Sequence, residues 1–164
     1  MIVNLTLNVE PRALPRARHT VRGDYASSYY PKKVKDTFIR YENEILRAFS
    51  DLNKEQRLYI IDEIREPKTA ISLVLIFYMP IPKSWSKKKQ REALGKPHIK
   101  KPDTDNMIKL VLDRANGTLF NDDKYVYKIC AEKIYSDNPR IELGIEYKEM
   151  SKWDILVLLD LYIQ

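Results

Sequence analysis

Two aspartates, Asp103 and Asp105, stand two residues apart in a short segment that reads Lys-Pro-Asp-Thr-Asp-Asn. Side chains at positions i and i+2 of an extended chain point the same way, so these carboxylates can converge on one cation. Lys109 and Asp113 follow Asp105 at four-residue intervals, which places all three on one face of a helix. The pattern predicts a metal-binding pair where a loop enters a helix, with a lysine one turn away.

A third acidic element, Asp122 and Asp123 behind Asn121, follows the predicted helix, where the chain could return beside the first pair. Carboxylate oxygens in this number suit Mg²⁺ or Mn²⁺, which keep waters for exchange with substrate phosphate oxygens. Such a site can activate water, and Lys109 is placed to stabilise charge on a phosphate. Because clustered carboxylates repel one another until a cation binds, their proximity favours a functional interpretation.

A structural interpretation of the same residues stays open. Asp105 could simply cap a helix, Lys109 and Asp113 could form a surface ion pair, and residues 121–123 could be a polar turn. His19 and His98 lack metal-ligand spacing and lie in basic segments, where contact with solvent or phosphate is expected. The sequence has no phosphate-binding glycine-rich loop, no HExxH motif and no recognisable Ser/His/Asp set, so other enzyme classes have little support.

Hydrophobic periodicity predicts the elements that must position these residues. Alternating residues 3–9 predict a strand with one buried face, and the apolar run at 69–79 predicts a central strand. Apolar residues at three- and four-residue spacing predict helices over 31–49, 51–66 and 105–115, the last with Ile108, Val111, Leu112 and Ala115 on its apolar side. Residues 125–135 and 140–147 predict two strands joined as a hairpin, and residues 11–31 and 80–101 are expected to be basic loops.

The 164-residue chain is a natural length for one domain with one core, which we expect to span residues 1–148. Residues 149–164 are an apolar extension with helical spacing, so it should pack on the body or on a partner. No apolar run approaches the roughly 18 residues of a membrane span, and no signal peptide is expected. The lone cysteine, Cys130, cannot form an internal disulfide, so we expect a core position for it and a reducing cytoplasm.

The net charge of +6 is unevenly distributed along the chain. Residues 11–35 hold seven Lys or Arg against one Asp, and residues 80–101 hold eight against one Glu. These two basic segments have local balances of +6 and +7, so the rest of the chain carries −7. Clustered lysine and arginine gain from releasing counterions condensed on phosphates, so the segments predict a polyanion-binding surface, with solvated loops as the alternative.

With these residues in view, the sequence resembles the RusA family of Holliday junction resolvases. The hallmark residues are the segment 101–106, then Lys109, Asp113, and after the helix Asp122 and Asp123. Residues 79–88 also resemble phage-type members, and the likeness covers residues 2 to about 148. The charged stretch at 51–68, the long basic stretch before Asp103 and the apolar tail depart from the family pattern.

The resemblance implies a small α+β domain, a mixed β-sheet with helices packed on it, that works as a homodimer on branched DNA. It implies that Asp103, Asp105 and Asp123 hold Mg²⁺, that Lys109 is the essential catalytic lysine, and it leaves the role of Asp122 open. Paired hydrolysis of opposed strands of a four-way junction, in recombination or repair in a phage or bacterial context, is the implied activity. The residues expected to contact DNA are Arg12, Arg16, Arg18, Lys83, Lys87, Lys88, Lys89 and Arg91.

Four aromatic residues interleave with the basic charge: Tyr25, Tyr29, Tyr30 and Trp85. They could stack on bases exposed at a junction, or pack beneath the loops. Three other functions remain open at the level of sequence: a nuclease acting on flaps, forks or RNA; a non-catalytic nucleic-acid-binding protein; and a partner-binding protein that uses the apolar tail.

Overall fold

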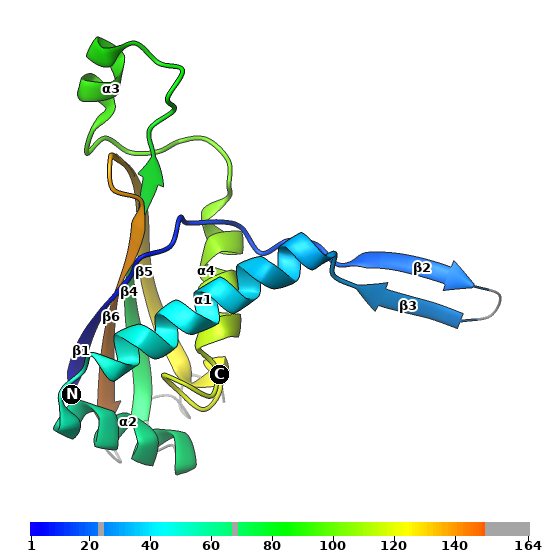
Figure 1. Ribbon diagram of the computed structural model, residues 1–164. Helices are drawn as coiled ribbons and strands as arrows, with labels where there is room; N and C mark the ends of the chain where they lie inside the picture. Colours follow the sequence, from blue (N-terminus) through cyan, green and yellow to red (C-terminus); the bar gives the residue numbers. More distant parts are fainter. Residues whose placement is uncertain (23–24, 67–68, 150–164) are drawn as a thin grey trace, which may run out of the picture.

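A four-stranded mixed sheet with helices packed on it forms the body of the computed structural model, which describes residues 1–22, 25–66 and 69–149 (Figure 1). The strand order is β1-β6-β4-β5, and β2 and β3 form a separate two-stranded ribbon. In chain order the elements are β1 (Ile2–Leu7), β2 (Arg18–Arg22), β3 (Tyr25–Tyr29), α1 (Lys32–Ser50), α2 (Lys54–Arg65), β4 (Thr69–Pro80), α3 (Lys87–Ala93), α4 (Thr104–Ala115), a 3-10 turn η1 (Asp123–Tyr125), β5 (Val126–Ser136) and β6 (Arg140–Glu149). The predicted α+β class is confirmed.

The predicted central strand is β4, which pairs on both edges. It runs parallel to β5 and antiparallel to β6, and β1 completes the sheet antiparallel to β6. The predicted hairpin of β5 with β6 is therefore wrong, because β4 lies between them. Strand β4 is long and mostly apolar, and such a strand is most stable inside a sheet, with a hydrogen-bonded neighbour on each edge. The connection from β5 to β6 therefore crosses over the end of β4.

Helix α4 provides the crossover that two adjacent parallel strands require. It runs back along the sheet, so its N-terminus lies at the carboxyl ends of β4 and β5 (Figure 1). In open sheets with parallel strands this end collects ligand sites, because loops and helix N-termini converge there. The topology thus brings the segment around Asp103 to the carboxyl end of the sheet.

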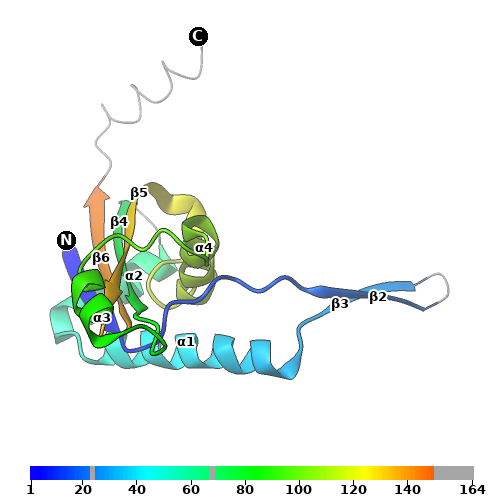
Figure 2. The ribbon, with the colours of Figure 1, turned by 90° about the horizontal axis from the view of Figure 1, so that it is seen from above.

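One face of the sheet carries the core. Residues of β1 alternate exposed and buried, and Val3, Leu5 and Leu7 face the helices. Helices α1 and α4 lie over this face in both views (Figures 1 and 2). They contribute Tyr41, Ile45 and other side chains to the same apolar cluster, among them Phe38, Met107, Leu110 and Val111. This burial fixes the position of α4, whose opposite side faces solvent.

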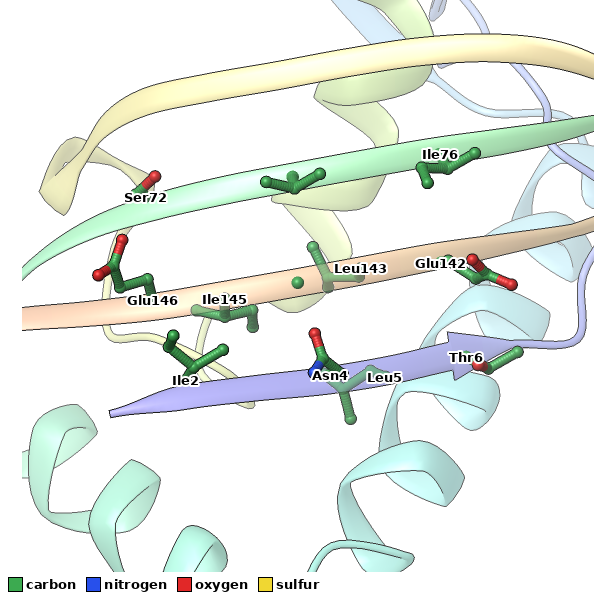
Figure 3. A pocket seen from close by; sticks show the side chains of 12 residues that line it. Ile2, Asn4, Leu5, Thr6, Ser72, Ile76, Glu142, Leu143, Ile145 and Glu146 are labelled. Atoms are coloured by element: carbon green, nitrogen blue, oxygen red, sulfur yellow. The ribbon is translucent and has the colours of Figure 1, made fainter.

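The other face of the sheet is open in the described residues. It has a groove of about 450 Å³ lined by β1, β4 and β6 (Figure 3). Val74, one of the lining residues, is 49% exposed. Cys130 is the register partner of Val74 on the edge strand β5 and is exposed, so the prediction of a core cysteine is wrong. A lone cysteine suggested a core position, but β5 is an edge strand and Cys130 lies on the uncovered face of the sheet.

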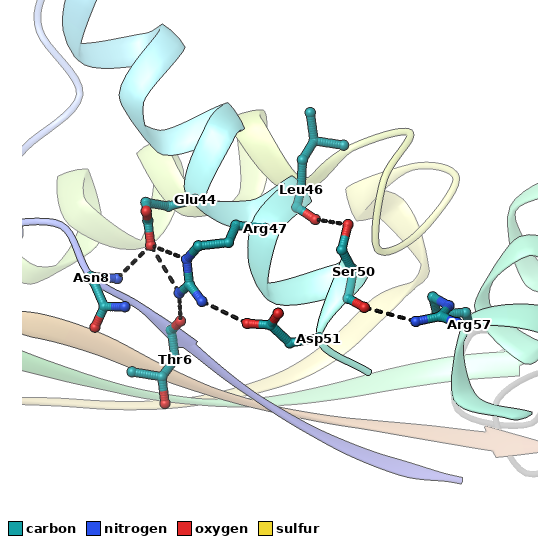
Figure 4. A network of polar contacts seen from close by, with 8 residues as sticks. All are labelled: Thr6, Asn8, Glu44, Leu46, Arg47, Ser50, Asp51 and Arg57. Atoms are coloured by element: carbon teal, nitrogen blue, oxygen red, sulfur yellow. Dashed lines mark hydrogen bonds and ion pairs between the residues drawn. The ribbon is translucent and has the colours of Figure 1, made fainter. Parts of the chain in front are cut away.

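An arginine on α1 holds this helix against β1. Arg47 donates hydrogen bonds to Glu44 at 2.9 Å, to Asp51 at 2.6 Å and to the carbonyl of Thr6 at 2.8 Å (Figure 4). Glu44 also accepts from the backbone N–H of Asn8. These contacts fix the exit of β1, shortly before the first basic segment begins at residue 11.

Both predicted basic loops contain regular structure. Within the predicted loop at residues 11–31, residues 18–22 and 25–29 form the β2–β3 ribbon, whereas residues 11–17 have no regular structure. Residues 80–101 contain α3, which Ser86 caps by accepting from the backbone N–H of Lys89. Neither element buries an apolar stripe, so neither has the periodicity by which the other elements were predicted. The predicted extension at residues 149–164 lies, apart from Glu149, outside the described residues. No helix within the described ranges is long and apolar enough to cross a membrane.

Tyr41 anchors the start of the first basic segment to α1. Its buried hydroxyl accepts from the backbone N–H of Arg12 at 2.9 Å and donates to the carbonyl of Glu10 at 3.1 Å. Tyr41→Phe would leave both backbone groups unpaired, so we expect a loss of about 1–3 kcal/mol in the free energy of unfolding, measured by urea denaturation. Tyr127→Phe, at a residue that is 58% exposed, should change it little. Equal stability of the two variants would contradict the anchoring role.

Candidate metal and DNA site

The N-terminus of α4 carries the predicted carboxylate pair. Asp103 is the N-cap residue, with extended backbone and no side-chain capping bond, and Asp105 lies in the first turn. The prediction that Asp105 caps the helix is therefore wrong, because helical hydrogen bonding begins with the N–H of Met107 on the carbonyl of Asp103. Both carboxylates are exposed, and neither has a side-chain hydrogen bond or ion pair with another described residue. They are free to bind a ligand.

Lys109 is exposed one turn along α4 and forms no ion pair with Asp113 in the described structure. The structural interpretation of these two as a surface pair is thus not realised. The last turn is held instead by Arg114, which pairs with Glu42 of α1 at 2.7 Å and lies over the ring of Phe38. Lys109 therefore stands beside the carboxylate pair without a competing partner.

The second acidic element does not join the first within one chain. Asp123 precedes β5, whereas the loop before Asp103 contacts Lys133, and Val126 to Lys133 spans about 23 Å at the usual rise of a strand. Accordingly, no group of three or more His, Cys, Asp or Glu in residues 1–22, 25–66 and 69–149 is arranged to hold a metal ion. The expectation that the chain returns beside the first pair is not met, because α4 carries it away.

Asp122 has a structural role in its turn. Its carboxylate accepts from the backbone N–H of Lys124 at 2.9 Å and lies 3.6 Å from the Lys124 ammonium. The backbone hydrogen bond from Lys124 lowers the pKa of the Asp122 carboxyl, with the charge of Lys124 contributing in the same direction. Asn121 donates to the carbonyl of Ile64 at 2.6 Å. The alternative of a polar turn thus holds for Asn121 and Asp122.

Both basic segments meet at the N-terminus of α4. The first contacts it directly, because the backbone N–H of Leu14 donates to the carbonyl of Asn106 at 2.9 Å. The second leads along the chain into Asp103. Six of the eight cations expected to contact DNA form no ion pair with another described residue, whereas Arg12 lies 3.5 Å from Glu10 and Lys88 lies 4.0 Å from Glu92. The exposed cations are Arg12, Arg16, Arg18, Lys83, Lys87, Lys88, Lys89 and Arg91.

The four interleaved aromatic residues divide into two groups. Trp85 packs against Tyr135 at 5.5 Å, with the ammonium of Lys89 over its ring at 4.2 Å, and Tyr30 packs edge-on against Phe38. Tyr25 and Tyr29 are 84% and 45% exposed on β3. Packing under the basic segments therefore describes Trp85 and Tyr30, whereas Tyr25 and Tyr29 remain available for a ligand.

His98 is buried rather than in contact with solvent, so that expectation is wrong. It is 8% exposed, its ring lies 4.5 Å from that of Tyr135, and its Nδ1 has no hydrogen-bond partner in the described structure. Its backbone N–H donates to the carbonyl of Lys133. Burial lowers the pKa of His98 below 6.5, and the charge of Lys133 acts in the same direction. The buried ring and this backbone hydrogen bond together secure the second basic segment to β5.

The depressed pKa of His98 predicts a stability change with pH. Since the unfolded state binds a proton more readily than the folded state, the contribution is present above about pH 6.5 and is lost as pH falls through the folded pKa. We expect the unfolding free energy of the wild type to fall more steeply from pH 7 to pH 5 than that of His98→Gln. Parallel pH profiles for the two proteins in chemical denaturation would rule out this role. His19 is exposed on β2, with its Nδ1 2.8 Å from the Ser28 hydroxyl, and serves as a comparison site.

Comparison with known proteins identifies the family to which this chain belongs. A family model for the endodeoxyribonuclease RusA matches residues 8–146, which include α4 and most of the sheet. The chain therefore belongs to the RusA endodeoxyribonuclease family, and the resemblance noted in the sequence is confirmed. It is also similar to the uncharacterized protein YqaN of Bacillus subtilis (strain 168), with 29% identity over 147 residues that cover 87% of this chain and 94% of that protein. Family membership implies endodeoxyribonuclease activity on DNA junctions.

Proposed function

We propose that this protein is a Mg²⁺-dependent endonuclease that resolves Holliday junctions by paired phosphodiester hydrolysis, in recombination or repair. The observation that carries the proposal is the set of residues gathered at the N-terminus of α4. Two exposed carboxylates without partners, Asp103 and Asp105, stand there with the free Lys109, and both basic segments meet at the same place. Membership in the RusA family supplies the class of substrate.

The donor set suits Mg²⁺, with Mn²⁺ as a substitute, because both ions prefer carboxylate oxygens. Mg²⁺ is commonly held by one or two carboxylates together with waters and substrate phosphates, so Asp103 and Asp105 are sufficient protein ligands at this end of α4. A bound ion would supply an activated water and charge neutralisation at the phosphate. Asp123 remains proposed as a third ligand only if a second copy of the chain contributes it, since its own α4 separates it from Asp103.

Lys109 is proposed to bind the phosphate that is cleaved. Its ammonium lies one helical turn after Asp105, on the exposed side of α4, and no acid of the described chain neutralises it. A positive charge fixed there favours the transition state, in which negative charge grows on the phosphate and leaving oxygens. The helix N-terminus adds its own partial positive charge at the same position.

The basic segments are proposed to position DNA through its backbone, and a homodimer to present two sites to opposed strands. Lysine and arginine contacts to phosphates fix register and orientation and carry little sequence information. A resolvase needs sequence-tolerant contacts of this kind together with two sites at a set separation. The open face of the sheet is one surface on which a second copy could pair.

The proposal is tested with labelled four-way junctions beside flap, fork and linear duplex substrates, in Mg²⁺ and in EDTA. We expect symmetrical nicks on opposed strands of the junction, only with the metal. Efficient cutting of flaps or forks would support metal-dependent hydrolysis but show that the substrate is not the four-way junction. Tight binding without cutting in either Mg²⁺ or Mn²⁺ would instead support a non-catalytic nucleic-acid-binding protein.

A further inference from the structure

The β2–β3 ribbon extends away from the body of the protein. Figures 1 and 2 show it past the end of α1, with no helix or strand over either of its faces. Every residue of β3 is exposed, and the described residues of β2 are exposed as well. Two-stranded hairpins without a covering layer are only marginally stable in water, so a ribbon of this kind gains order from a ligand or a partner.

The two faces of the ribbon differ in chemistry. Register pairs Arg18 with Tyr29 and Thr20 with Ser27, and side chains alternate along each strand, so these four share one face with Tyr25. Thr20 and Ser27 are 2.9 Å apart through their hydroxyls. The opposite face carries His19, Ser28 and Ala26. The first face offers a guanidinium, two phenols and two hydroxyls, which are the side-chain groups that contact DNA phosphates and sugars.

The base of the ribbon is fixed next to the candidate site. Leu14, four residues before Arg18, donates its backbone N–H to Asn106 beside Asp105. At the other end, Tyr30 packs on Phe38 of α1 at a ring distance of 5.0 Å. A five-residue strand is about 17 Å long, roughly the length of five base pairs. Neither β2 nor β3 contains an acidic residue, so nothing on the strands repels a phosphate backbone.

We propose that the β2–β3 ribbon is a DNA-binding arm that lies along the duplex next to the cleaved phosphate, with the face of Arg18, Thr20, Tyr25, Ser27 and Tyr29 against the backbone. The proposal rests on the proposed function, since it takes DNA as the substrate. A two-stranded ribbon also has the width that the major groove of B-DNA admits. The base of the arm is anchored beside the N-terminus of α4, so the arm extends the DNA-contacting surface beyond that site.

The arm is tested with Arg18→Gln/Tyr25→Ser/Tyr29→Ser, and Ala26→Ser/Ser28→Ala on the opposite face is the matched control. Binding to a duplex and to a four-way junction is followed by fluorescence anisotropy over a range of salt concentrations. We expect the triple variant to weaken binding on the order of 10-fold and to lower the salt slope by about 1, because one phosphate contact is lost. The control should change affinity by less than about 2-fold.

If the triple variant kept the wild-type DNA affinity and salt slope, the proposed DNA-binding role of the ribbon would be wrong. A variant with unchanged DNA affinity but altered sedimentation would assign the ribbon to contact between protein copies, which also overturns it. Since both measurements are of binding, they stand apart from the proposed function. If the wild type bound DNA through the ribbon but did not cut it, the proposed nuclease activity would be wrong and the DNA-binding role of the ribbon would stand.

A separate observation concerns Lys133, which the sequence pattern did not single out because it stands in an ordinary strand. Lys133 is partly buried, and its ammonium donates to the carbonyl of Lys100 at 2.7 Å and to that of Pro102 at 2.6 Å. The carbonyl of Pro102 belongs to the peptide bond that leads into Asp103. Across the described ranges, no backbone-to-backbone hydrogen bond involves residues 99–102, and Ile99 is 89% exposed. The two hydrogen bonds from the Lys133 ammonium therefore tie residues 99–102 to β5.

We infer that Lys133 is a positioning residue, which sets the separation of Asp103 and Asp105 by holding the loop that presents them. This inference too rests on the proposed function. It is tested with Lys133→Met, which keeps the length of the side chain and removes its donors, and with Lys133→Arg, which restores donors. Lys128→Met, at an exposed lysine of the same strand, is the matched control.

Three quantities are measured: hydrogen exchange over residues 99–106, the Kd for Mn²⁺ alone, and kcat and KM for the junction. We expect Lys133→Met to exchange faster over this stretch and to bind Mn²⁺ about 10- to 100-fold more weakly, with KM for DNA unchanged and partial rescue in Lys133→Arg. Unchanged exchange, or faster exchange with wild-type Mn²⁺ affinity, would overturn the positioning role while the nuclease stands. A wild type that neither binds Mn²⁺ nor cuts would overturn both.

Discussion

Replacing Asp105 with Asn should abolish Mg²⁺-dependent cleavage of a four-way junction and leave junction binding intact. The substitution keeps the shape of the side chain and removes its charge, so the first turn of α4 should persist. Groups that merely support a metal ligand contribute about 10- to 100-fold to affinity or activity, and a direct ligand should exceed that range. The measurement is single-turnover cleavage of a labelled junction, with anisotropy to follow binding.

The matched control for this variant is Asp62→Asn, at an exposed aspartate on α2. It removes the same charge from a region away from the two basic segments. Cleavage by Asp62→Asn should remain within about 2-fold of wild type, because a surface carboxylate without a ligand contributes little. If Asp105→Asn cut the junction at a rate near that of Asp62→Asn, the carboxylate pair would have no catalytic role.

Lys109→Met should lower kcat for junction cleavage by about 10²- to 10³-fold, which is the usual contribution of one fixed group that stabilises transition-state charge. KM should change far less, because the ammonium interacts most strongly when charge accumulates on the phosphate. Lys109 is exposed, so its loss leaves no buried group unpaired and stability should hold. The measurement is kcat and KM under multiple turnover, with Lys54→Met on α2 as the matched control.

A different pattern in the Lys109 variant would assign it another role. A large rise in KM with kcat preserved would make Lys109 one more phosphate contact, equivalent to the lysines of α3. Rates equal to those of Lys54→Met would remove it from the site. Lys109→Arg should recover only part of the rate, because the guanidinium places its charge differently from an ammonium.

Elements that bury an apolar face were predictable from the sequence. The alternation in β1, the apolar run of β4 and the helical spacing in α1 and α4 all reflect contact with the core. Because the buried positions of each element are apolar, the sequence carries a pattern from which the element can be predicted. The β2–β3 ribbon and α3 bury little, and their sequences therefore looked like loops. Strand pairing was harder still, because the order β1-β6-β4-β5 depends on contacts between distant segments.

The candidate site was predictable in part for a similar reason. Asp103, Asp105 and Lys109 are close in sequence, so local geometry alone places them at one end of α4. The position of Asp123 depends on the direction in which α4 runs, which spacing does not reveal, and the structure separates it from the pair within one chain. Lys133 and His98 both take part in tertiary contacts between β5 and the segment before Asp103, and nothing in their sequence neighbourhood marks them.

The most direct test of the central claim uses a supercoiled plasmid that extrudes a cruciform, a four-way junction held in a circle. A metal-dependent enzyme with two sites that cut opposed strands converts this plasmid to the linear form, with little nicked circle as an intermediate. We predict linear product in Mg²⁺, none in EDTA and none with Asp105→Asn. Accumulation of nicked circles alone would contradict paired cleavage, and equal activity in EDTA or in Asp105→Asn would contradict a metal site at the N-terminus of α4.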